Sequence, residues 1–252
     1  PQGVEILVRG PESRIQAFRA GLVRDCPPVA RITGLEEEAL TPEPDEGVFT
    51  IVPSAQGQGH NVLISPDIAT CDQCVQDITD PDNPRFQYPF TNCTNCGPRY
   101  TITTSIPYDR PSTSMACFPM CLDCAAEYDD PGNRRFHAQP NACPVCGPQV
   151  WLTDSEGGPL CSSRDALERA ADDLAKGLIL ALQGLGGFHL ACRATHDHAV
   201  QELRTRKSRW GKPLAVMVPD LETAHKIGEV SPRAADWLAG TVRPVVLVPK
   251  KP

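Results

Sequence analysis

The sequence contains no run of eighteen consecutive apolar residues, so we expect no part of it to span a membrane. It also shows no signal peptide, the segment that directs proteins to the oxidising compartments in which disulfides persist. We therefore expect a cytoplasmic protein whose twelve cysteines are thiols or metal ligands. The chain begins with Pro1 rather than Met, which indicates a piece of a longer protein.

Eight of the cysteines form two copies of one pattern, in which eighteen residues separate two Cys-x2-Cys pairs. The first copy is Cys71, Cys74, Cys93 and Cys96, and the second is Cys121, Cys124, Cys143 and Cys146. Every cysteine recurs after fifty residues, and so do neighbours such as Asn83, which recurs as Asn133. A repeat of this kind indicates one small unit built twice.

Two cysteines separated by two residues can bind one ion, and a second such pair completes the tetrahedron that Zn²⁺ accepts. We therefore predict two structural zinc ions. Disulfides would need an oxidising compartment, a redox dithiol normally occurs as a single motif, and iron–sulfur clusters use tighter spacings. Gly97 and Gly147 follow the second pairs, where we expect positive φ and close backbone approach. Each unit has few apolar residues, so the metal should supply much of its folding free energy.

The remaining cysteines have no place in this pattern. Cys117 lies four residues before Cys121 and could substitute as a ligand, although a small buried side chain is the simpler interpretation. The same interpretation applies to Cys26, Cys161 and Cys192. His137 lies within the second unit, where we interpret it as a packing residue because four sulfurs already complete a zinc site.

The apolar pattern predicts a β-α-β-β arrangement at the start of the chain, half of a small α+β sandwich. The expected strands are residues 4–8, 29–35 and 48–52, and the expected helix is Pro11 to Val23. A linker is expected over residues 53–62.

After the cysteine units, strands and helices alternate, which predicts an α/β domain whose sheet is incomplete. The expected helices are Asp165–Lys176, with a cap from Ser162 and Asp165, then Asp197–Lys207, Leu221–Ile227 and Ser231–Ala239. The expected strands are Leu178–Leu182, Phe188–Ala191, Leu214–Val218 and Pro244–Val248.

Three cations at the end of the helix 197–207 form a candidate phosphate site. They are Lys207, Arg209 and Lys212, and Pro213 favours an extended conformation at Lys212. A guanidinium flanked by two ammonium groups is a good receptor for a polyphosphate. Alternatively, basic residues here simply complement the helix dipole.

A glycine-rich turn is the other candidate ligand contact, formed by Gly184, Gly186 and Gly187 with His189 beside it. Because glycine has no side chain, a ligand can approach the backbone of such a turn closely. The turn lacks the order G-x-G-x-x-G and precedes a strand, which disfavours a dinucleotide-binding turn. His189 could face either a ligand or the core, and a lone histidine favours the core.

Several runs of residues resemble the HypF carbamoyltransferases, the maturation factors of [NiFe]-hydrogenases. These runs are residues 88–102, 107–111, 134–140, 186–192, 207–209 and 212–213. The resemblance implies an α+β multi-domain chain. Its parts would be the second half of a ferredoxin-like acylphosphatase domain at 1–53, a linker at 54–65, tandem C4 zinc fingers at 66–152 and a partial α/β YrdC-like domain at 163–252.

The resemblance also implies a reaction in the full-length protein. Carbamoyl phosphate and ATP with Mg²⁺ would give carbamoyl adenylate, and the carbamoyl group would pass to the C-terminal cysteine of the protein HypE. Lys207, Arg209 and Lys212 match the motif with which YrdC-like domains hold ATP phosphates. No acylphosphatase residue can be assigned, Arg193 replaces the usual acidic residue, and the chain alone is expected to lack the complete reaction.

Two other functions remain open, a zinc ribbon that binds nucleic acid and a protein-docking module. Nucleic-acid binders have basic surfaces, whereas this chain has a net charge of -7. Within the first cysteine unit, Arg85 is the only basic residue. The charge therefore disfavours nucleic acid, while docking to HypE is compatible with an enzymatic role.

Overall fold

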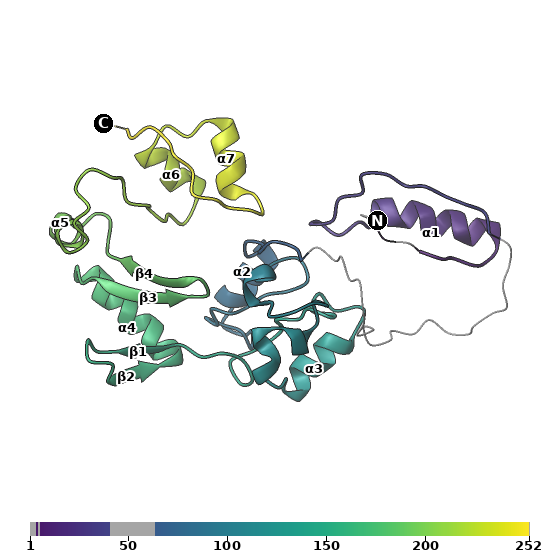
Figure 1. Cartoon of the computed structure of the whole chain (residues 1–252), viewed down its shortest axis with the longest axis horizontal. Helices are drawn as coiled ribbons and strands as arrows, with labels where there is room; N and C mark the ends of the chain where they lie inside the picture. The colour runs from purple at the N-terminus through teal and green to yellow at the C-terminus, as the bar shows by residue number, and fades with distance from the viewer. Residues whose placement is uncertain (1–3, 5, 41–63, 252) are drawn as a thin grey trace. The chain divides into compact units, whose positions relative to one another are not determined.

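The computed structural model describes residue 4, residues 6–40 and residues 64–251. The chain divides into two compact units, Pro1–Ala55 and Gln56–Pro252, which are described separately (Figure 1). None of the helices in the described ranges combines the length and the apolar character needed to cross a bilayer.

The first unit contains one described helix, α1 (Glu12–Arg24), which confirms the helix expected from Pro11. Glu12 in its first turn and Arg24 in its last turn both complement the helix dipole. The strands predicted at 4–8 and 29–35 are wrong for the described residues, which adopt no strand there. A strand exists through hydrogen bonds to a neighbouring strand, and the described part of this unit offers none. Residues 48–52 lie outside the described ranges.

The fifty-residue repeat is visible in the backbone of the second unit. Helix α2 (Asp72–Thr79) and helix α3 (Leu122–Asp129) occupy equivalent positions, and each begins immediately after the first cysteine of its set. Each helix buries a single residue, Cys74 in α2 and Cys124 in α3. The helices are therefore oriented by the sulfur sites rather than by an apolar stripe. Three short 3₁₀ helices lie between them, η1 (Tyr100–Ile102), η2 (Arg110–Ser112) and η3 (Ser114–Cys117).

A small apolar core is shared by the two fingers. Its buried residues are Tyr88, Ile102, Met115 and Ala142, packed against Phe90, Tyr108 and Phe118. Tyr88 belongs to the first finger, and its hydroxyl donates a hydrogen bond of 3.0 Å to the carbonyl of Pro148 in the second. The two fingers therefore bury apolar surface together that neither could bury alone.

The two glycines that follow the second cysteine pairs have different roles. Gly97 has φ +96°, as expected for a residue in the left-handed region. Gly147 is not among the residues with positive φ, so the expectation is wrong there. A Cβ at Gly147 would instead collide with the hydroxyl of Tyr88 and the Cβ of Ala142. Gly147 thus makes room for the contact between the fingers.

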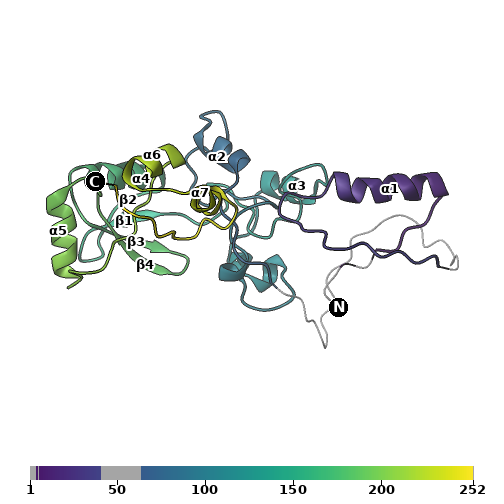
Figure 2. The ribbon, with the colours of Figure 1, turned by 90° about the horizontal axis from the view of Figure 1, so that it is seen from above.

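The α/β segment begins with two antiparallel hairpins beside one helix (Figures 1 and 2). The first hairpin is β1 (Trp151–Thr153) with β2 (Pro159–Ser162), followed by α4 (Ser163–Ala175). The second is β3 (Leu180–Gly184) with β4 (Gly187–Ala191), in which Leu182 pairs with His189. These elements confirm the predicted helix from Asp165 and the strands from Leu178 and Phe188, with boundaries shifted by up to two residues. The predicted Ser162 cap is wrong, since its side chain makes no capping hydrogen bond.

Three further helices confirm their predictions. They are α5 (Asp197–Arg206), α6 (Leu221–Ile227) and α7 (Pro232–Ala239). The hydroxyl of Ser231 caps α7 by accepting from the N–H of Ala234 at 3.2 Å. The strands predicted at 214–218 and 244–248 are wrong: the described backbone there has no strand, and Met217 and Leu247 are 98% and 85% exposed. Both segments are apolar enough for a buried strand, but the described residues provide no neighbouring strand with which either could pair.

The close approach at Gly147 generates a prediction about stability. Gly147→Ala should overpack the contact with Tyr88 and lower the free energy of unfolding by about 1–3 kcal/mol. Thermal unfolding of the zinc-loaded chain measures this as a lower Tm. Gly211→Ala is the matched control, because no atom lies within 4 Å of a Cβ there. Equal melting temperatures for the two variants would contradict the packing role of Gly147.

Candidate metal centres

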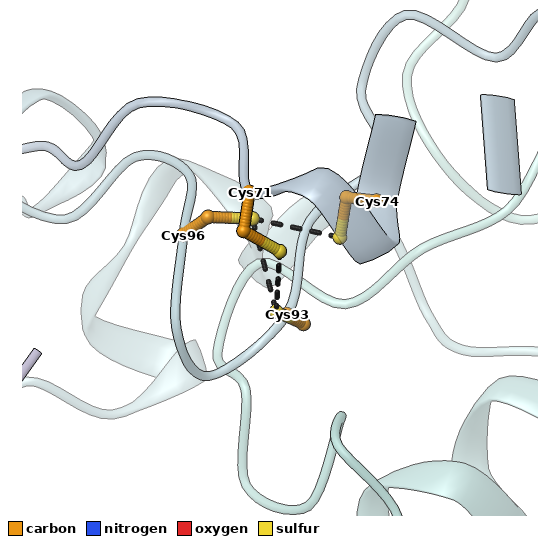
Figure 3. A group of neighbouring side chains, drawn as sticks. All are labelled: Cys71, Cys74, Cys93 and Cys96. Atoms are coloured by element: carbon orange, nitrogen blue, oxygen red, sulfur yellow. Dashed lines mark hydrogen bonds between the residues drawn. The ribbon is translucent and has the colours of Figure 1, made fainter. Parts of the chain in front are cut away.

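The first cysteine set forms a compact group of four sulfurs (Figure 3). Cys71 is the N-cap of α2 and Cys74 lies in its first turn, so the start of the helix brings both sulfurs to one side. Cys93 and Cys96 face each other across a tight antiparallel bridge. The Sγ–Sγ distances are 3.7 Å between Cys71 and Cys93, 3.8 Å between Cys93 and Cys96, and 3.5 Å between Cys74 and Cys96.

The second set repeats this arrangement around α3. The sulfurs of Cys121 and Cys143 are 3.7 Å apart, those of Cys143 and Cys146 are 3.8 Å apart, and those of Cys124 and Cys146 are 3.6 Å apart. In each set, all four sulfurs lie within 4.8 Å of one another. The structure therefore brings together the residues that the spacing predicted, with one group in each unit.

Both sets fit a zinc ion. A regular tetrahedron with Zn–S bonds of about 2.3 Å has edges of about 3.8 Å, close to the observed separations. A disulfide requires sulfurs about 2.05 Å apart, and all twelve cysteines are free. Zinc would be held by four thiolates in each finger, which is the closed ligand set of a structural site rather than a catalytic one.

Burial and hydrogen bonds shift the pKa values of the sulfurs within each set in opposite directions. Hydrogen bonds with Cys74 and Cys93 lower the pKa of Cys96 to about 3, while the complementary bonds raise the pKa of Cys93. In the second set, burial raises the pKa of Cys124. Burial also acts on Cys146, but backbone hydrogen bonds outweigh it and lower that pKa to about 7. Zinc binds these sulfurs as thiolates, so metal binding releases the protons that they hold.

Charged residues from each finger extend to the other finger. The guanidinium of Arg85, in the first finger, pairs with Glu127 of the second at 2.5 Å and donates to Cys124 Sγ at 3.4 Å. In the opposite direction, Arg134 donates to Cys74 Sγ at 3.0 Å, and Arg134 and Arg135 both pair with Asp77. These side chains hold the two sulfur groups in one charged network.

The sequence prediction missed this network, although a signal for it existed. Arg85 and Arg135 occupy equivalent positions of the repeat, as do Asp77 and Glu127. The recurrence of an acidic and a basic residue at fixed positions could have indicated a duplicated ion pair. What the sequence did not show is that the pairs form between the copies.

The cysteines outside the pattern lie outside both groups. Cys117 is exposed, whereas Cys26, Cys161 and Cys192 are partly buried, so the prediction of small buried side chains is wrong for Cys117. His137 packs on Tyr128, with ring centroids 4.8 Å apart, as expected for a packing residue.

The predicted phosphate-binding cations lie together on the loop after α5. Lys207 is the C-cap of this helix, and Arg209 and Lys212 follow on the exposed loop. Arg204 fixes the loop, because its guanidinium donates to the carbonyls of Arg209 and Lys212, each at 3.0 Å. All three predicted cations are exposed and therefore accessible to an anion.

The glycine-rich turn is the tip of the hairpin β3–β4, where Gly184 pairs with Gly187. Gly187 has φ +130°, which explains the need for glycine there. His189 is exposed, so the preference for a core position is wrong. The glycine-rich turn lies between β3 and β4, whereas the basic loop follows the C-terminal end of α5. The two candidate sites therefore belong to separate segments of the chain (Figure 1).

Comparison with known protein families identifies two parts of the chain. Residues 70–103 and 120–153 each match the family described as HypF finger. Residues 172–252 match the family described as telomere recombination, which is named for Sua5, YciO and YrdC.

Curated relatives match nearly the whole chain. Carbamoyltransferase HypF2 of Cupriavidus necator is 47% identical over 99% of this chain and 31% of its own length. Carbamoyltransferase HypF of Synechocystis is 46% identical over 99% of the chain and 32% of its own length. The probable carbamoyltransferase HypF of Methanocaldococcus jannaschii is 41% identical over 98% of the chain and 32% of its own length. The chain thus spans about a third of the length of these relatives.

Two solved structures share the fold. Full-length HypF in a phosphate- and nucleotide-bound form matches 96% of this chain and 31% of its own, with a TM-score of 0.82 and 41% identity. T. kodakarensis HypF matches 99% of this chain and 31% of its own, with a TM-score of 0.75 and 42% identity.

Paired tetrathiolate fingers followed by a YrdC-like segment define a zinc-finger protein of mixed helix and strand structure, which confirms the predicted fold class. Nearly the whole chain is similar in sequence and in fold to HypF proteins, as its residue runs indicated, and it contains two HypF fingers.

The two sulfur groups predict how much zinc the chain binds. Cys96→Ser and Cys146→Ser should each remove at least one of the two ions, because three thiolates no longer close the tetrahedron. Cys117→Ser is the control and should keep both, because this exposed cysteine lies in neither group. Elemental mass spectrometry against protein concentration measures the stoichiometry. Full zinc content in Cys96→Ser, or a loss in Cys117→Ser, would refute the ligand assignment.

Proposed function

We propose that this chain is a segment of a carbamoyltransferase that acts in [NiFe]-hydrogenase maturation. One observation carries the proposal: proteins named carbamoyltransferase HypF are 41% to 47% identical to it over 98% to 99% of its length. Such identity extends across both fingers and the α/β segment. In the full-length protein, the corresponding parts would be an acylphosphatase-like end at 1–53, a linker at 54–65, the zinc fingers at 66–152 and part of a YrdC-like domain at 163–252.

The proposed substrates are carbamoyl phosphate and ATP with Mg²⁺. With one water consumed, they would form carbamoyl adenylate, releasing pyrophosphate from ATP and inorganic phosphate from carbamoyl phosphate. The carbamoyl group would then pass to the C-terminal cysteine of HypE in the cytoplasm, with release of AMP. A similar solved structure is a phosphate- and nucleotide-bound form of full-length HypF, which supports a nucleotide-using reaction in that protein. In this chain, the exposed cations after α5 are the groups suited to polyphosphate.

The basic loop would act by holding the phosphates of ATP. Negative charge spreads over the leaving pyrophosphate during adenylation, and fixed cations stabilise that charge. The ammonium groups of Lys207 and Lys212 are exposed, whereas Arg204 uses its guanidinium to hold the loop. The two lysines are therefore available to a ligand, while Arg204 holds the loop and Arg209 also donates to the carbonyl of Pro213 at 3.2 Å. The turn at Gly184, Gly186 and Gly187, with His189, is proposed as a second contact for a ligand.

The structure gives a reason to prefer this function to nucleic-acid binding. Residues 64–150 contain no lysine and five arginines, and each of the five donates hydrogen bonds to internal acceptors. The five are Arg85, Arg99, Arg110, Arg134 and Arg135. A surface that binds nucleic acid needs cations available to phosphates. The arginines of the fingers are instead used to hold the fold.

The phosphate-site assignment predicts the effect of two substitutions in the full-length protein. Lys207→Ala and Lys212→Ala should each lower the carbamoyl-phosphate-dependent release of pyrophosphate from ATP by roughly 100-fold, the usual effect of removing one group that stabilises transition-state charge. Arg233→Ala, at an exposed position of α7, is the control and should keep the activity.

The experiment distinguishes a failure of the proposed reaction from a failure of the proposed phosphate site. If the unaltered full-length protein releases no pyrophosphate, the proposed reaction is wrong. If it does so and both lysine variants match it, the reaction stands and the phosphate site lies elsewhere.

A further inference from the structure

The interface between the fingers is itself duplicated. Arg85 of the first finger pairs with Glu127 of the second, and Arg135 of the second pairs with Asp77 of the first. In each case the arginine and the acid occupy the same two positions of the fifty-residue repeat. The interface therefore approximates two-fold symmetry, with each finger supplying one arginine and one acid to its partner.

Backbone contacts follow the same symmetry. The Nε–H of Arg85 donates to the carbonyl of Ala142 at 2.8 Å, and the Nε–H of Arg135 donates to the carbonyl of Asn92 at 3.2 Å. Asn92 and Ala142 are again fifty residues apart. Both arginines are buried, with 4% and 6% of their surface exposed. They are thus firmly placed between the fingers.

The symmetry breaks at the sulfurs. Arg85 donates to Cys124 Sγ, but in the other direction the donor to Cys74 Sγ is Arg134 rather than Arg135. The position equivalent to Arg134 in the first finger is Pro84, which has no donor. The sulfur group of each finger nevertheless receives one guanidinium from the other finger. The acceptors are equivalent in the two fingers, since each is the buried cysteine of the finger helix.

Four thiolates around Zn²⁺ carry a formal charge of about −2, and a donor beside a ligand stabilises that charge and fixes the orientation of the ligand. We propose that Arg134 and Arg85 are reciprocal positioning residues: each holds a zinc ligand of the opposite finger, so each finger retains its metal through the folding of the other. The proposal rests on zinc binding by the two sulfur groups and is independent of carbamoyl transfer.

The crossed arrangement predicts a crossed effect. Arg134 lies in the second finger but contacts a sulfur of the first, so Arg134→Gln should speed metal loss from the first finger by about 10-fold or more. The second finger should keep a rate close to that of the unaltered chain. Arg85→Gln should show the opposite pattern, with faster loss from the second finger.

The experiment must report on each finger separately. The zinc-loaded chain is mixed with excess chelator, sampled over time, and pulsed with an alkylating agent that modifies only sulfurs without metal. Peptide mass spectrometry then gives the rate of exposure for Cys74 and for Cys124 in the same sample. Protection of the second finger in Arg134→Gln also shows that the variant is folded.

Arg135→Gln is the matched control. Arg135 pairs with Asp77 as Arg134 does, but within the described part of the chain its side chain donates to oxygen atoms and not to sulfur. It should therefore lack the selective effect on the first finger. If Arg134→Gln exposes both fingers equally, the proposal is wrong. It is also wrong if Arg135→Gln exposes Cys74 as fast as Arg134→Gln does while Cys124 stays protected. An unaltered chain without zinc would overturn the metal assignment as well.

Discussion

The stability of the fingers depends on balancing the charge of buried thiolates. Four sulfurs lie within 4.8 Å of one another in each finger, an arrangement that is unfavourable unless cations compensate it. Zinc fits at the centre of each group, and a guanidinium from the opposite finger approaches the helix cysteine. The shared apolar core around Tyr88 is small, so these polar contacts specify how the two fingers pack. In the described chain, the two fingers therefore form one structural unit rather than two independent domains.

The finger pair contrasts with the segment that follows it. The cations Lys207, Arg209 and Lys212 lie on an exposed loop, and Arg204 holds two of its carbonyls. Preorganisation of this kind lowers the entropy lost when a ligand binds. The chain therefore uses arginine in two ways. Arg85 is buried in the fingers and donates to a sulfur, whereas the partly buried Arg204 near the end of α5 holds a loop suited to an anion.

Local signals explain what could be predicted from the sequence. The zinc ligands were predictable because their spacing and repetition are constrained by tetrahedral geometry. Helix α7 was predictable from Ser231, Pro232 and Gly240, which act within a few residues. The crossed contacts were not, since Arg85 and Cys124 are 39 residues apart and their pairing depends on how the fingers pack. The strands at 214–218 and 244–248 were wrong because an apolar run predicts burial but cannot supply the neighbouring strand.

The exchange of ion pairs between the copies limits how the two halves of the repeat can diverge. Because Arg85 meets Glu127 rather than the acid of its own finger, a charge reversal at one position is best compensated in the other copy. Residues in equivalent positions can differ, as Pro84 and Arg134 do, only where another residue supplies the hydrogen bond to the cysteine of the opposite finger. Arg85 does so for Cys124. Each copy of the repeat therefore depends on the other for an ion-pair partner and for the donor to its helix cysteine.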